Sequence, residues 1–159
     1  MDLGGLKQAL ARMIALGPGL SQVEVLCAFP HGSALPLVGP AVLISVDGLE
    51  LTPAGLGGFA HSEAGENASV TLRFDFFSPG EGGPGLDGYC EALCAVLLSH
   101  GGEFGLRRVW SERTAWDDMA GSYRRSARAQ FVGWARAGAG GAVAGPAGIE
   151  DFRLVARPM

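Results

Sequence analysis

The stretch SVTLRFDFF, residues 69–77, decides the fold class of this chain. Polar and apolar side chains alternate along it from Ser69 to Phe76. The apolar positions are Val70, Leu72, Phe74 and Phe76. A period of two is typical of a β-strand that buries one face and exposes the other. The sequence therefore predicts a sheet with one apolar face, and this strand lies inside it.

Further strands are predicted on both sides of this stretch. VEVLCAF (23–29) and AVLISVDGLEL (41–51) precede it, and Asp47-Gly48 within the second indicates a β-bulge or a tight turn. GLRRVWSERTAW (105–116) and SYRRSARAQFVGW (122–134) follow it. IEDFRLVARP (149–158) is an additional C-terminal strand.

Two helices complete the pattern. Residues 2–16 and 86–100 carry apolar side chains at spacings of three and four, and glycines at 17 and 101 end them. The order is α-β-β-β-α-β-β. Short connections favour antiparallel hairpins, so we expect an α+β fold whose mainly antiparallel sheet is flanked by two helices.

The length of 159 residues favours one domain. We expect a single α+β domain over 1–137, a Gly/Ala-rich linker over 138–148, and a strand or tail over 149–159. TPAGLGGFAHSEAGENA (52–68) is rich in glycine and polar residues and is predicted to be a long exposed loop between two strands.

Composition and charge argue against several classes of function. The net charge is −4, which argues against a general nucleic-acid binder. The chain has no apolar run of about 18 residues for a membrane span, and its N-terminus, with Asp2 and no basic start, does not resemble a signal peptide. Cys90 and Cys94, four residues apart on one helix face, fit a reducing, intracellular setting.

Candidate catalytic and metal-binding residues are scattered. The Cys90/Cys94 pair lacks the spacing of a structural zinc site, and two buried core thiols explain it as well. The three histidines, His31, His61 and His100, lie in or beside loops, and no G-x-S-x-G motif occurs. We therefore expect no catalytic, cofactor-binding or metal-binding residues.

The segment 115–131, AWDDMAGSYRRSARAQF, contains an acidic pair followed by three arginines. Asp117, Asp118 and Gly121 are predicted to form the turn between two strands. On the second strand Arg124 and Arg128 share one face, while Arg125 lies on the other. This separation argues against a continuous phosphate-binding surface. Cross-strand pairs of Glu112 with Arg124 or Arg128 would satisfy the charges without any ligand.

A subunit interface is the other interpretation of this segment. Tryptophan, tyrosine and arginine are enriched in interfaces, and this part of the chain gathers all three. The alternative is that the tryptophans fill the domain's own core. The interface residues we predict are Glu112, Trp116, Asp117, Asp118, Tyr123, Arg124 and Arg128.

The order and lengths of these elements resemble the tail terminator (tail completion) proteins of long-tailed phages and prophages. The resemblance covers residues 3–134, from LKQALARMIAL through TLRFDFFSP and LDGYCEALCAVLLSH to RRVWSERTAWDDMAGSYRRSARAQFVGW. It departs from the family in the 52–68 loop and after residue 137. A neighbouring connector or baseplate component is an alternative within the same class.

The resemblance implies a non-enzymatic protein that forms a homo-oligomeric, hexameric ring, caps the tail tube and joins it to the head. Its partners would be further copies of itself, tail-tube proteins and head–tail connector proteins, in the virion or the host cytoplasm. Oppositely charged residues such as Asp117/Asp118 and Arg124/Arg128 would suit the two different patches of a head-to-tail ring contact. Two alternatives remain: a small enzyme or ligand-binding domain with a pocket under the 52–68 loop, and a neck protein that contacts DNA.

Overall fold

The computed structural model describes residues 3–27, 38–53, 65–79, 85–136 and 153–155. The predicted α+β fold and its element order are confirmed. The elements are α1 (Leu3–Leu16), β1 (Glu24–Leu26), β2 (Ala41–Pro53), β3 (Gly65–Ser78), α2 (Leu86–His100), the 3-10 helix η2 (Gly101–Phe104), β4 (Leu106–Ser111), β5 (Ala115–Asp117), β6 (Ser122–Arg136) and β7 (Arg153–Val155).

The strands form one sheet in the order β1-β2-β3-β6-β4, and β5 and β7 also pair with β6. All pairs are antiparallel except β1 with β2, which is parallel. A parallel pair needs a crossover connection of about a dozen residues or more. Residues 27–40, between β1 and β2, are long enough to make that crossover.

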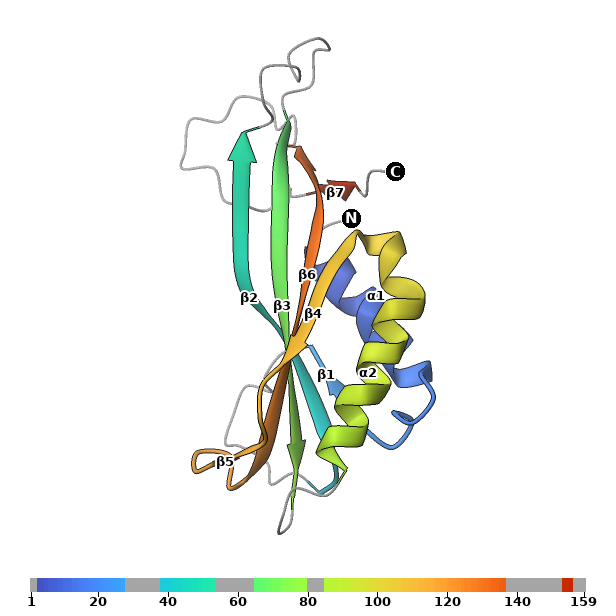
Figure 1. The fold of residues 1–159 in the computed structure, drawn as a ribbon, viewed down its shortest axis with the longest axis vertical. Helices are drawn as coiled ribbons and strands as arrows, with labels where there is room; N and C mark the ends of the chain where they lie inside the picture. Colours follow the sequence, from blue (N-terminus) through green and yellow to red (C-terminus); the bar gives the residue numbers. More distant parts are fainter. Residues whose placement is uncertain (1–2, 28–37, 54–64, 80–84, 137–152, 156–159) are drawn as a thin grey trace.

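Both helices lie on one face of the sheet, as Figure 1 shows. Val70, Leu72, Phe74 and Phe76 of β3 face them and are completely buried, as the alternation in this stretch predicts. They pack against Leu10 and Ile14 of α1 and against Leu93 and Leu97 of α2 in one hydrophobic cluster. Burial of each such side chain stabilises the fold by roughly 1.5–3 kcal/mol.

A β-bulge shifts the alternation in β2. Ile44 and Val46 pair with Phe74 and Leu72, but the register shifts between Val46 and Gly48, so that Leu49 pairs with Val70. Asp47 is the extra residue. Of the two features that Asp47-Gly48 indicated, a β-bulge or a tight turn, the structure has the bulge. The bulge returns Leu49 to the helix side of the sheet.

Three sequence predictions change in their boundaries. The segment 105–116 is two strands, because β4 ends at Ser111 and β5 begins at Ala115. The strand predicted at 23–29 is described only as Glu24–Leu26. The loop predicted at 52–68 is shorter, since β2 runs to Pro53 and β3 starts at Gly65. Residues 54–64 and 138–148 lie outside the described residues.

The sheet is longer than the helix layer. In Figure 1 the strands β2, β3 and β6 continue well past both helices at the top of the view. Leu51 lies on the helix side of this extension and is 38% exposed. β7 pairs with the end of β6 there, at Trp134–Arg136. In the described part of the chain, neither helix has the length and apolar character needed to cross a bilayer.

Candidate functional site

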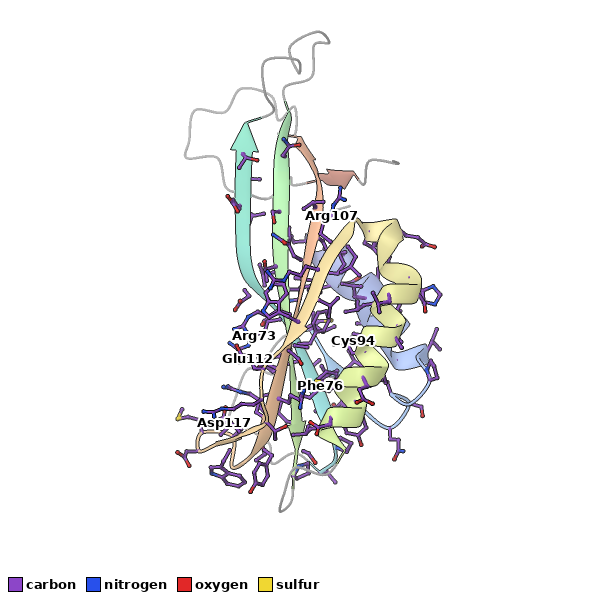
Figure 2. All side chains as sticks on the ribbon, in the orientation of Figure 1. Arg73, Phe76, Cys94, Arg107, Glu112 and Asp117 are labelled. Atoms are coloured by element: carbon purple, nitrogen blue, oxygen red, sulfur yellow. The ribbon has the colours of Figure 1, made fainter. Side chains whose placement is uncertain are left out.

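The face of the sheet opposite the helices, called the polar face below, carries the charged residues singled out in the sequence. Its members include Asp47 on β2, Arg73 and Asp75 on β3, Trp110 on β4, Glu112 directly after β4, and Arg124, Ser126 and Arg128 on β6. Figure 2 shows Arg73 and Glu112 on the side away from the helices and Phe76 on the helix side. The predicted division of the β6 side chains between the two faces is confirmed.

Arg128 is the centre of the largest ion network on this face. Its Nε donates to Asp47 Oδ2 at 2.8 Å, and its Nη1 donates to Glu112 Oε1. The hydrogen bond from Arg128 lowers the pKa of Glu112, and those same bonds, first to Glu112 and then to Asp47, raise the pKa of Arg128. Of the two pairings predicted for Glu112, with Arg124 or with Arg128, the structure has the one with Arg128.

A second network is buried. Asp75 is 6% exposed and accepts hydrogen bonds from Arg73 Nε at 2.8 Å and from the hydroxyl of Ser126. Arg73 Nη2 also lies 3.4 Å from Ser126 Oγ. A buried carboxylate is expensive unless charged and neutral donors satisfy it. Asp75 has both, which makes a structural role sufficient to explain it.

The third group of residues forms the hairpin of β5 and β6. Asp117 accepts the backbone N–H groups of Met119 and Ala120 at 3.1 and 3.0 Å, and pairs with Arg124 at 2.7 Å. Gly121 follows with φ 57°, a value that favours glycine. The predicted turn is confirmed, and the carboxylate of Asp117 both builds the turn and neutralises Arg124.

The aromatic pair of this hairpin is formed across the two strands. Trp116 and Tyr123 are directly opposite, with ring centroids 5.1 Å apart and an edge-to-face geometry. Trp116 is 50% exposed, and Met119 in the turn is 96% exposed. Asp118 is also exposed. Figure 2 places Asp117 at the far end of this hairpin, away from the helices.

Six of the seven predicted interface residues fall into two groups, and the seventh, Tyr123, is partly buried and packs against the hydrophobic core. Glu112, Asp117, Arg124 and Arg128 take part in ion pairs inside the chain. Trp116, Asp118 and, outside the prediction, Met119 lie exposed on the hairpin. The sequence reasoning missed Met119, although a large apolar side chain in a turn beside Asp118 and Gly121 was a signal of an exposed contact.

The opposite face of β6 also carries an ion pair. Arg125 lies on the helix side and its Nη1 contacts Asp87 in the first turn of α2, while its Nη2 lies 3.3 Å from Ser111 Oγ. Arg125 and Arg128 therefore form their ion pairs on opposite faces of β6. Arg125 pairs with Asp87 of α2, and Arg128 pairs with Asp47 of β2 and with Glu112 after β4. This geometry confirms that the arginines do not form one continuous basic surface.

The cysteines are free thiols. Cys90 lies in the core cluster, and burial raises its pKa to about 11. Burial also raises the pKa of the half-buried Cys94. Both therefore stay protonated near neutral pH, and packing explains them. Within the described ranges, no three histidine, cysteine or acidic residues are placed to share a metal ion. His31 and His61 lie outside those ranges.

Comparison with known proteins does not assign a family. No protein-family model matches this chain, and no curated protein matches it in sequence. The class of protein is therefore defined by its fold, an α+β domain with both helices on one face of a mainly antiparallel sheet.

Proposed function

We propose that this chain is a non-enzymatic structural subunit of a phage or prophage tail, which assembles with copies of itself into a ring that caps the tail tube or joins tail to head. The exposed hairpin of β5 and β6 carries the proposal. Trp116 and Met119 offer apolar area there, on a turn that Asp117 and the Trp116–Tyr123 contact hold in shape. An ordered, exposed aromatic group is a common anchor of protein interfaces.

The charges around the hairpin also support a protein contact. Arg124 is paired with Asp117, so the hairpin from Ala115 to Arg124 presents no basic surface, and Asp118 is its remaining charged residue. Interface cores are depleted in net charge, while basic surfaces suit nucleic acid. The order and lengths of the elements, which resemble tail terminators, give the proposal its biological setting.

Assembly in solution is the direct test. We expect multi-angle light scattering at rising protein concentration to detect masses well above the 16.4 kDa monomer, and electron microscopy of the same sample to show rings. A chain that stays monomeric at the highest concentration, both alone and with tail-tube protein, contradicts the proposal. Genes for capsid, portal or tail-tube proteins beside this one would agree with it.

A double variant tests the role of the hairpin. We expect Trp116→Ala with Met119→Ser to raise the concentration needed for assembly at least about tenfold, since loss of a contact residue of this kind costs about 2 kcal/mol of association free energy or more. The control is Leu16→Ser with Leu98→Ser, which removes exposed apolar area from the two helices instead. Equal effects of the two double variants would show that the hairpin has no special role.

A further inference from the structure

The sheet has two edges where strand pairing stops. On one side β1 pairs only with Ala41–Leu43, which leaves β2 from Ile44 to Pro53 without an outer partner among the described strands. On the other side, β6 is the one described strand that pairs with β4. The outer edge of Leu106–Ser111 therefore also has no partner among the described strands. An open edge presents unpaired backbone N–H and C=O groups to another strand.

These two edges have opposite charge. The open part of β2 carries Asp47 and Glu50 and has no lysine or arginine. β4 carries Arg107 and Arg108 and has no acidic residue. Glu50, Arg107 and Arg108 are exposed, and none of them forms an ion pair with another described residue. Opposite charges on the two edges favour pairing of one edge with the other over pairing of either with itself.

The open parts of β2 and β4 also lie at the same level along the strand direction. Leu49 of β2 pairs with Val70, Val70 pairs with Phe131, and Phe131 pairs with Leu106 of β4, which makes one row across the sheet. Glu50 pairs with Ser69 and Arg108 with Gln130, so both occupy the polar face, close to this row. A neighbour placed beside β2 without a shift along the strands therefore brings its Arg108 near Glu50.

The relative directions of β2 and β4 also suit a contact between the two edges. Three successive antiparallel pairs separate β2 from β4, so β2 and β4 run in opposite directions. When the β4 edge of one subunit meets the β2 edge of the next, the new pair is antiparallel and continues the pattern of the sheet. β5 pairs with the same edge of β6 as β4, because β3 occupies the other. The Trp116 hairpin thus belongs to the same side of the subunit as β4.

We propose that copies of this chain assemble by adding the β4 edge of one subunit to the open β2 edge of the next, with Arg108 opposite Gly48 and diagonally across from Glu50 on the polar face. This inference rests on the proposed function, since it names the surfaces through which the ring would form. The contact is heterologous, so each subunit uses both edges, and rotation between neighbours closes a ring.

A charge-swap experiment tests the contact. We expect Glu50→Arg and Arg108→Glu each to reduce the assembled mass to that of the monomer at moderate salt, because each puts like charges at positions 50 and 108 across the contact. The double variant Glu50→Arg/Arg108→Glu should assemble again, and so should an equimolar mixture of the two single variants. Glu91→Arg on α2 and Arg12→Glu on α1 are exposed controls with the same charge changes.

The outcomes separate this inference from the proposed function. Circular dichroism and thermal unfolding first establish that each variant is folded. A wild-type chain that never assembles contradicts the proposed function and this contact together. A wild-type chain that forms rings, while both single swaps form them equally well, overturns the edge contact alone. Loss in the single variants without recovery in the mixture or the double variant also overturns it.

Discussion

Arg128 on β6 reaches Asp47 on β2, 81 residues earlier in the chain, with its Nε 2.8 Å from the carboxylate. β3 lies between these two strands, so the side chain of Arg128 spans it. The partner, Asp47, is the extra residue of the β-bulge. One guanidinium thus fixes the bulge of β2, the end of β4 and the middle of β6 relative to each other.

The first prediction concerns this network. Arg128→Met should lower the free energy of unfolding by about 1–2 kcal/mol, because it leaves Asp47 and Glu112 without their shared cation. Arg124→Met is the matched control, since Arg124 is 37% exposed and, among the described residues, forms an ion pair with Asp117 alone. It should cost less than about 1 kcal/mol. Urea unfolding measures both, and equal losses would contradict the central role of Arg128.

The second prediction is a pH dependence. Hydrogen bonding from Arg128 holds the folded-state pKa of Glu112 below its ordinary value of 4.5. A carboxyl group with a lowered folded pKa stabilises the fold above its unfolded pKa, and that contribution is lost as the pH falls through the folded pKa. Below pH 4.5 the wild type should therefore lose stability more steeply than Glu112→Gln. Urea unfolding at a series of pH values tests this, and parallel curves would exclude it.

The third prediction concerns the buried carboxylate. Asp75→Ala should destabilise the fold by about 2–4 kcal/mol, since it leaves Arg73 and the hydroxyl of Ser126 without their acceptor. Asp87→Ala removes an acidic partner of Arg125 that is 75% exposed, and should change stability by less than about 1 kcal/mol. Thermal and urea unfolding of the two variants provide the comparison. A small loss in Asp75→Ala would mean that the network contributes little.

The fourth prediction concerns a glycine where the chain passes close to β6. Gly105 has φ 75°, and a Cβ there would lie 2.1 Å from the carbonyl oxygen of Val132. Gly105→Ala should therefore cost at least about 2 kcal/mol. Gly88→Ala in α2, where the added Cβ meets nothing within 4 Å, should instead stabilise by up to about 1 kcal/mol. Chemical denaturation distinguishes the two signs.

The sequence alone predicted the parts of the fold that depend on local periodicity. The alternation in 69–77 and the helical spacing in 86–100 follow from burial on one face, which is a local pattern. The parallel pairing of β1 with β2 could not be predicted in the same way, because it depends on a crossover through residues 27–40. The split of β4 from β5 also lacked a signal, since Glu112–Thr114 between them contain no glycine or proline.

The contacts of the candidate site likewise divide into those that local periodicity predicts and those that it does not. The sharing of a face by Arg124 and Arg128 follows from the two-residue period, and so did the pairing of Arg128 with Glu112 on the next strand. The contact of Arg128 with Asp47 crosses a whole strand, and no local pattern specifies it. The open edges of β2 and β4 are properties of strand order, which becomes visible only when the sheet is assembled.

The bulge at Asp47 determines which side chains in the second half of β2 face the helices. Apolar side chains occupy even positions before the bulge, at Val42, Ile44 and Val46, and odd positions after it, at Leu49 and Leu51. Deletion of Asp47 would remove the bulge and leave Leu49 and Leu51 on the helix side, with the partners that they have now. Straightening of β2 with every residue retained would instead turn Glu50 toward the helix layer and Leu49 and Leu51 toward the polar face. A relative that lacks this residue can therefore keep the same order of polar and apolar side chains after it, and an alignment of such relatives should place its gap at Asp47–Gly48.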